Sequence, residues 1–331
     1  MTPAADLPTF QGPLARECDA FLAYRRDLAT CHEHVVVALR HLDRFLAVHA
    51  PDASTLTRPV ISAWMATLTD RAAITRANYF RVVRQFSAFR ARTDPAVFIP
   101  DSLMCPRVTT RFRPYIYSES EIRALLTAAA RLDGGLRSHT YVTLLLVLYT
   151  TGLRIGEAIR LQLGDLDRDR AVLHIRAGKF RKSRLVPISA GLRARLDQYV
   201  EHRQRGGAPT TPDAALFWSP RGGHYSLVGV QHGLSQLLRT VCGKRPGQKS
   251  GPRVHDLRHA FAVHRLLCWY REGADVQAKL PLLATYLGHC SFLSTQWYLT
   301  ATPELMAEAS RRFHQGFGAL VHLSGDVDDH H

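Results

Sequence analysis

One stretch of the chain, from Asp94 to Tyr115, lacks the periodicity found on either side of it and so limits how the chain can fold. Four prolines interrupt this stretch, and a proline inside a helix removes a hydrogen bond and clashes with the preceding turn. We therefore expect two domains joined by a basic, proline-rich linker, an arrangement that suits 331 residues. The expected boundaries are a helical domain at 1–103, the linker at 104–116, a second domain at 117–313 and a C-terminal tail at 314–331.

Residues 14–92 have the apolar spacing of amphipathic helices. Apolar residues recur from Val35 to Leu46 until Pro51 breaks the pattern, and a second segment begins at Pro59. A third segment, 73–92, carries an apolar stripe opposite a basic face. That face is either a solvated helix surface or a contact for a polyanion, and the sequence leaves both open. Its candidate contact residues are Arg76, Arg81 and Arg84.

The second domain combines helices with a small sheet. Ser118 and Glu121 have the spacing of a capping box, which predicts the start of a helix. Residues 171–175 and 184–188 alternate in polarity as strands do, and 178–182 lies between them as a hairpin turn. Further helices are expected at 141–150, 154–163, 191–203, 226–241, 255–270 and 280–287, and from 295 onward. The predicted fold class is mainly α with a small antiparallel β-sheet: a helical N-terminal domain and a mixed α+β domain.

The charge of the chain indicates a polyanionic partner. Lysine and arginine total 43 against 28 acidic residues, a formal net charge of +15. Such a charge attracts polyanions over long distances, and DNA or RNA is the leading candidate. A basic protein without such a partner is the alternative, and charge alone does not decide between the two.

Cysteine usage and hydropathy predict an intracellular protein. The six cysteines form no C-x-x-C pair, so we expect reduced thiols. Residues 1–12 lack the apolar core of a signal peptide, and the longest apolar run, 141–149, is too short to span a bilayer. We therefore expect a cytoplasmic, nucleoid-associated protein with no membrane partner.

Five residues of the second domain together suggest a reaction. They are Arg154, His255, Arg258, His289 and Tyr298. Two guanidinium groups can clamp a phosphodiester and neutralise the charge that builds on it, and a tyrosine hydroxyl can attack it once a neighbour takes its proton. His255 and Arg258 stand three residues apart, so on a helix they share one face. Glu157 follows Arg154 at the same spacing and can orient its guanidinium.

Four of these five residues also have a simpler explanation. Arg154 could pair with Glu157 on a helix surface, and Tyr298 could be a packing residue. His255 could begin a helix, and His289 could cap one. The simpler explanations would require all of these coincidences together in one chain, so we prefer the catalytic interpretation.

The motifs that hold these residues resemble those of a known family. Thr151-Gly152-Leu153-Arg154-Ile155-Gly156-Glu157 resembles box I of the tyrosine recombinases, also called phage integrases. His255-Asp256-Leu257-Arg258-His259, with Leu287-Gly288-His289 and Tyr298, resembles their box II. The resemblance covers residues 118–298, and the helical N-terminal region fits the family's core-binding domain.

This resemblance implies a site-specific recombinase that cuts and rejoins DNA through a 3′-phosphotyrosine intermediate, in integration, excision or transposition of a mobile element. Tyr298 would be the nucleophile, and Arg154 and Arg258 would clamp the phosphate. His255 would be the general base, and His289 would donate a hydrogen bond to the phosphate.

The general acid in this scheme is a lysine of the hairpin, because Gly178 to Pro187 resembles the turn that carries the family's catalytic lysine. Alignment on the residues flanking the turn favours Lys179 over Lys182. After Tyr298 the sequence lacks the histidine that many relatives have two residues later, and it resembles integrases of transposons and other mobile elements.

The resemblance also implies partners. Four protomers, of one kind or two, would assemble on specific double-stranded DNA sites, and accessory recombinases are further candidates. No cofactor, metal or ATP is expected, because the chain has neither a histidine cluster at ligand spacing nor a Walker motif. The alternatives are a non-catalytic DNA-binding regulator on the same fold and a type IB topoisomerase-like enzyme. Candidate DNA contacts outside the 73–92 helix are Arg107, Arg111, Arg113, Lys244, Arg245, Lys249 and Arg253.

Overall fold

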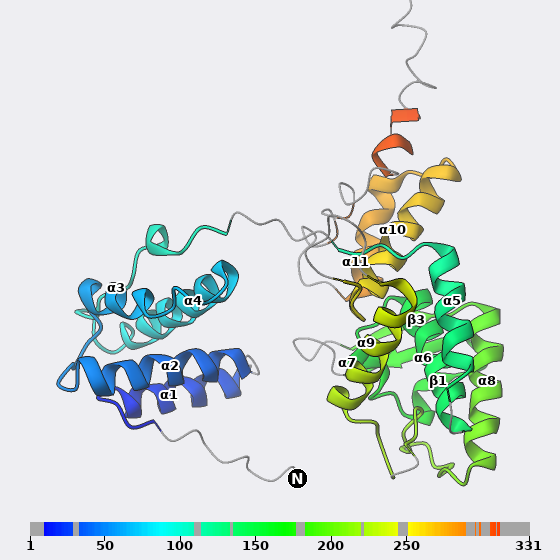
Figure 1. Cartoon of the computed structure of the whole chain (residues 1–331), viewed down its shortest axis with the longest axis horizontal. Helices are drawn as coiled ribbons and strands as arrows, with labels where there is room; N and C mark the ends of the chain where they lie inside the picture. Colours follow the sequence, from blue (N-terminus) through cyan, green and yellow to red (C-terminus); the bar gives the residue numbers. More distant parts are fainter. Residues whose placement is uncertain are drawn as a thin grey trace, which may run out of the picture. The chain divides into compact units, whose positions relative to one another are not determined.

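The structure, a computed structural model, divides the chain into two compact units, residues 1–112 and 113–331 (Figure 1). It describes residues 10–28, 33–108, 114–132, 135–176, 183–219, 222–243, 251–288, 295, 298, 305–308 and 310–311. Each unit has its own apolar core. Within the described residues, no helix is both long and apolar enough to cross a membrane.

The first unit is helical, as the sequence predicts. Its helices are α1 (Ala15–Asp27), α2 (Glu33–His49), α3 (Arg58–Ala66) and α4 (Ala73–Arg90), followed by the short 3-10 helix η1 (Ser102–Met104). The side chain of Thr57 accepts a hydrogen bond from the Val60 backbone and so caps α3, and a proline in the first turn fixes the entry. Aromatic side chains from three helices, Phe21, Trp64, Phe80 and Phe86, are fully buried among them.

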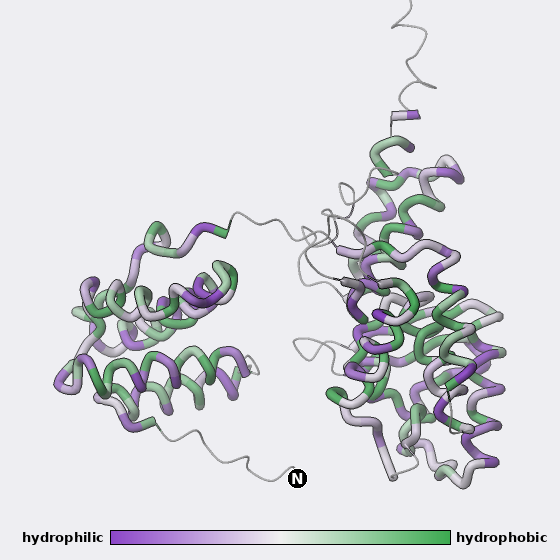
Figure 2. Tube along the Cα trace, viewed as in Figure 1, coloured by the Kyte–Doolittle hydropathy of each residue, from purple (hydrophilic) through white to green (hydrophobic). Residues whose placement is uncertain are grey.

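The second unit holds the remaining helices and the sheet. The helices are α5 (Glu119–Ala130), α6 (Leu136–Thr151), α7 (Ile155–Ala158), α8 (Ala190–Arg205), α9 (Leu227–Cys242), α10 (Asp256–Arg271) and α11 (Val276–Leu287), with the 3-10 helix η2 (Leu163–Asp165). The predicted capping box is present, because Ser118 and Glu121 each bond the other's backbone amide at the start of α5. Helix α6 packs against α5, α8 and α10. Figure 2 shows many hydrophilic positions along α8, whose buried face is limited to one side.

A three-stranded antiparallel sheet lies in this unit in the order β1-β2-β3. The strands are β1 (Leu166–Asp167), β2 (Val172–Ile175) and β3 (Arg184–Pro187). Leu173 faces Val186 across the β2–β3 pair, and both are buried, as the alternation in the sequence predicts. The predicted fold class, mainly α with a small antiparallel sheet, is confirmed. Strand β1 was not predicted, because two residues are too few to show alternation.

Three helices differ from the prediction. Helix α6 begins at Leu136, five residues before the expected start at residue 141. The helix expected at 154–163 ends at Ala158, because the backbone beyond it bonds another segment: Leu216 donates to Leu161 O, and Leu163 donates to Ala214 O. Helix α11 begins at Val276 rather than at residue 280, because the Asp275 side chain caps it. Most of the helix expected from 295 onward lies outside the described residues.

Candidate functional site

Arg154 reaches the site because α6 stops at a glycine. Gly152 adopts the left-handed conformation (φ 63°) that ends α6, and Arg154 then becomes the N-cap of α7. A Cβ on Gly152 would lie 2.6 Å from a ring carbon of Phe261 and 2.7 Å from a methyl of Leu287. Only glycine therefore allows this turn to approach α10 and α11 so closely.

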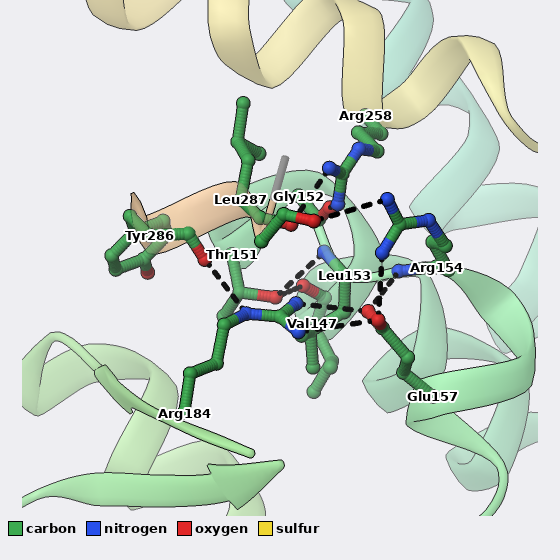
Figure 3. Close-up of polar contacts among 11 residues, drawn as sticks. Val147, Thr151, Gly152, Leu153, Arg154, Glu157, Arg184, Arg258, Tyr286 and Leu287 are labelled. Carbon is green, nitrogen blue, oxygen red and sulfur yellow. Dashed lines mark hydrogen bonds and ion pairs between the residues drawn. The ribbon is translucent and has the colours of Figure 1, made fainter. Parts of the chain in front are cut away.

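Arg258 is buried at the start of α10, with 2% of its surface exposed. Its Nη1 donates to Gly152 O and its Nη2 to Leu287 O, both at 2.7 Å, so the guanidinium joins α10 to the ends of α6 and α11 (Figure 3). Burial, together with the nearby Arg154 charge, lowers the pKa of Arg258 to about 10. The group therefore stays charged at neutral pH, and backbone carbonyls hold it in place.

Glu157 lies between two arginines, Arg154 and Arg184 (Figure 3). Its Oε1 accepts from Arg154 Nη1 at 2.8 Å, the pairing that the three-residue spacing predicts. Arg184 Nη2 donates to the other carboxylate oxygen at 2.9 Å, and its Nη1 donates to Oε1 at 3.2 Å. Burial alone would raise the pKa of Glu157, but the hydrogen bonds and charges of the two arginines outweigh it and hold the pKa at about 2.

Arg184 is the residue of this network that sequence reasoning missed. Arg184 begins β3, and in the sequence it is notable only as a residue that flanks the lysine hairpin. In the structure its Nε also donates a hydrogen bond to Tyr286 O at 2.9 Å. A signal existed: Arg184 shares a strand face with buried Val186, and an arginine on a buried face needs an anionic partner. Gly288 packs against this guanidinium, since a Cβ there would lie 2.8 Å from Arg184 Nη1, at a φ of +68°.

Tyr298 places its hydroxyl beside Arg258 and His259. The side chain is 2% exposed, and its Oη lies 2.9 Å from His259 Nδ1. Burial raises the pKa of Tyr298, while a hydrogen bond from Arg258 and the charges of Arg258 and Arg154 oppose the rise. The predicted nucleophile and both predicted clamp arginines therefore lie in one site.

His255 occupies the N-cap position of α10 and keeps part of its imidazole in solvent. Its ring meets the ring of His259 edge-on, with centroids 4.9 Å apart. Desolvation of the part of the ring that is packed against protein lowers the pKa of His255 to about 4, and the positive charges of Arg258 and Arg154 contribute to this shift. His255 is therefore neutral at pH 7 and able to accept a hydrogen bond or a proton.

Several predicted residues fall outside the described part of the chain. They are Lys179, the alternative Lys182, His289, Arg111, Arg113, Lys244, Arg245 and Lys249. Their assignments stay predictions.

The predicted DNA contacts that the structure describes are mostly exposed arginines. Arg81 and Arg107 are exposed, Arg84 is exposed and bonds Pro100 O, and Arg76 is half-buried. Arg253 differs, because it pairs with the buried Asp256 at 3.2 Å and so also has a structural role at the start of α10. Its pairing reduces the charge that it can offer to another anion.

Within the described residues, the site places the guanidinium groups of Arg154, Arg184 and Arg258 near one carboxylate, Glu157. This excess of positive charge suits a phosphate, and the buried phenol beside it suits attack on that phosphate. No group of three or more His, Cys, Asp or Glu side chains that could hold a metal ion occurs among the residues the structure describes.

The site matches known proteins in sequence and in fold. Residues 116–304 match the profile of the Phage integrase family. The integrase/recombinase y4rB of Sinorhizobium fredii is 42% identical over 243 residues, which cover 72% of this chain and 76% of that protein. The Tn1549 transposon integrase, solved in complex with transposon right end DNA, has a similar fold at 14% identity, with a TM-score of 0.67 and coverage of 90% of this chain and 98% of that one. A lambda integrase, solved as a tetramer bound to a Holliday junction, matches at 15% identity and a TM-score of 0.59 over 83% of this chain and 75% of that one.

Proposed function

Because the chain belongs to the phage integrase family, the tyrosine recombinases, we propose that it cuts and rejoins DNA at specific sites through a covalent link between Tyr298 and a 3′-phosphate. The observation that carries this proposal is the convergence of the Tyr298 hydroxyl, Arg154 and Arg258. Its biological setting is the integration, excision or transposition of a mobile element, as the Tn1549 integrase suggests.

The arginines act on the scissile phosphate. Arg154 and Arg258 neutralise charge on its non-bridging oxygens as the transition state forms, and Glu157 and the backbone carbonyls fix their directions beforehand. Preorganised donors of this kind need no rearrangement during the reaction, which is the source of their large effect on rate. The attack of Tyr298 then breaks the bond to the 5′-oxygen.

Three further residues complete the scheme. His255 is the predicted general base, and its neutral state at pH 7 supports a role as acceptor. Lys179 is the predicted general acid that protonates the leaving 5′-oxygen, with Lys182 as the alternative. His289 is the predicted hydrogen-bond donor to the phosphate.

The assembly on DNA follows from the same family relationship. Both units would contact DNA, with exposed arginines such as Arg81 and Arg107 and the basic linker at 104–116 on the phosphate backbone. Four protomers would join two DNA sites, as in the lambda integrase tetramer. The reaction would take place in the cytoplasm, at the nucleoid.

A nicked suicide substrate tests this function, because the nick lets a short strand diffuse away and traps the covalent intermediate. The wild-type protein is expected to form a protein–DNA adduct on a denaturing gel, without added metal or ATP. Arg258→Ala should slow adduct formation by about 100-fold or more, with a much smaller loss of DNA affinity. Binding without any adduct would indicate a DNA-binding regulator, and relaxation of supercoiled DNA without exchange between sites would indicate a topoisomerase-like enzyme.

A further inference from the structure

His259, one residue after Arg258 on α10, is the second histidine of the HDLRH motif, and no role in the reaction is predicted for it from the sequence. Its Nδ1 lies 2.9 Å from the Oη of Tyr298. Both groups sit within the protein: Tyr298 is 2% exposed and His259 is half-buried. A rigid helix position therefore holds an imidazole nitrogen at hydrogen-bond distance from the atom that must attack the phosphate.

The partners of the Tyr298 hydroxyl indicate the direction of this hydrogen bond. The Arg258 guanidinium lies close to the phenolic oxygen, and a guanidinium carries positive charge and can only donate hydrogen bonds. The lone pairs of the oxygen therefore face this cation, and its own hydrogen is available to the second neighbour, the Nδ1 of His259. Imidazole with its hydrogen on Nε2 presents Nδ1 as an acceptor, which matches the observed contact.

We infer that the catalytic residue that takes the proton of Tyr298 as the hydroxyl attacks DNA is His259, in place of His255, to which the family resemblance gives that role. The step rests on the proposed function. The Oη–H bond breaks and its proton moves to His259 Nδ1, while Oη forms a bond to phosphorus and the bond from phosphorus to the 5′-oxygen breaks. The leaving oxygen takes a proton from the general acid. In rejoining, the imidazolium of His259 returns its proton to the tyrosine oxygen.

The surrounding charges couple this transfer to DNA binding. After the proton transfer, the imidazolium of His259 and the guanidinium of Arg258 are two positive charges beside the same tyrosine oxygen, and like charges repel. A bound phosphate supplies the negative charge that offsets both cations. The nucleophile therefore stays protonated until the phosphate is in place, and the edge-on contact with His255 keeps the His259 ring oriented.

Substitution of His259 by asparagine tests the role, because the amide oxygen of Asn can stand near the position of Nδ1 and accept a hydrogen bond but cannot hold the proton. The rate of adduct formation is measured on the nicked suicide substrate at saturating protein, so that binding does not limit it. His259→Asn should slow this rate by about 100-fold or more, the usual contribution of a general base, with unchanged DNA affinity and melting temperature.

A matched control exists on the same helix. The Nδ1 of His264 lies 2.9 Å from the hydroxyl of Tyr149, the same distance as in the His259–Tyr298 pair, and this second pair is away from the arginine network. His264→Asn should therefore cleave at close to the wild-type rate. If His259→Asn has a lowered melting temperature, the response of this variant to a more acidic phenol at position 298 still distinguishes a lost base from a lost contact.

A second measurement separates proton transfer from simple positioning. Tyr298 is replaced by a fluorinated tyrosine, whose phenol loses its proton more readily and so depends less on a base. In the His259→Asn background this replacement should recover at least about tenfold in rate. A defect that the fluorinated residue does not relieve, or a His259→Asn rate equal to that of wild type, overturns the inference. Absence of an adduct with the wild-type protein would instead overturn the proposed function.

Discussion

At the scale of single residues, the site is organised around one buried carboxylate. Glu157 bonds Arg154 and Arg184 at once, and this fixes the guanidinium of Arg154, the predicted clamp residue, before any DNA arrives. Removing one partner of a buried ion pair strands the charge of the other, which is far more costly than losing an exposed pair. The spacing in the sequence predicted the Arg154 contact. It could not predict Arg184, because that contact joins residues 27 positions apart across the sheet and α7.

The depressed pKa of Glu157 gives stability a defined pH dependence. The folded pKa of about 2 lies below the ordinary value of 4.5, so the ionised form favours folding. This stabilisation is complete above about pH 4.5 and is lost as the pH falls through 2. Glu157→Gln should lower the free energy of unfolding by about 3 kcal/mol at pH 7. Chemical denaturation of both proteins from pH 7 to pH 2.5 should show the difference shrinking below pH 4.5; a difference that stays constant would refute the ion-pair account.

At the scale of helices and strands, the elements that could be predicted were those marked by short sequence patterns. Capping signals and alternation are short-range, so the start of α5 and the strands β2 and β3 were predicted closely. The end of helix α7 depends on long-range backbone pairing, such as the bond from Leu216 to Leu161 O, and a pattern of side chains does not encode such pairing. Strand β1, with two residues, is too short to show alternation. Box I was thus identified correctly as a motif, while its expected helix was too long.

The turn between β2 and β3 carries the predicted general acid. A DNA substrate with sulfur in place of the 5′-bridging oxygen tests this assignment, because a thiolate leaves without needing a proton. Lys179→Ala should cleave normal DNA slowly and the sulfur substrate at close to the wild-type rate. Lys182→Ala should cleave both substrates well. The reverse pattern would assign the general acid to Lys182.

At the scale of the whole molecule, the net charge predicted the class of partner, and the proline-rich stretch predicted two domains. Neither predicted which residues contact the partner. The excess of basic residues indicated a polyanion, and two compact units are present. The proton acceptor proposed here, His259, was outside the reach of sequence reasoning. Its contact with Tyr298 spans 39 residues, and a second histidine beside an arginine on a helix shows no distinguishing pattern.

Binding of DNA should depend strongly on salt. Each neutralised phosphate releases condensed counterion, so log affinity falls with log salt by about 0.9 per contact. Replacing Arg111 and Arg113 together by alanine should reduce that slope by up to about two and weaken all DNA sequences similarly. As a control with the same change in net charge, Arg123 and Arg205 are replaced by alanine. Both are exposed arginines that already pair with acidic side chains, Glu119 and Glu201 respectively. An equal effect in both double variants would mean that net charge, and not the linker, carries the dependence.

The identity of the residue that becomes linked to DNA tests the central claim most directly. The wild-type protein is trapped on the nicked substrate, digested with protease and nuclease, and the peptide that carries a nucleotide is sequenced by mass spectrometry. We predict that the nucleotide is attached through a phosphate to the Tyr298 side chain, and that Tyr298→Phe binds DNA but yields no adduct. An adduct on another residue, or one that persists in Tyr298→Phe, would contradict the account.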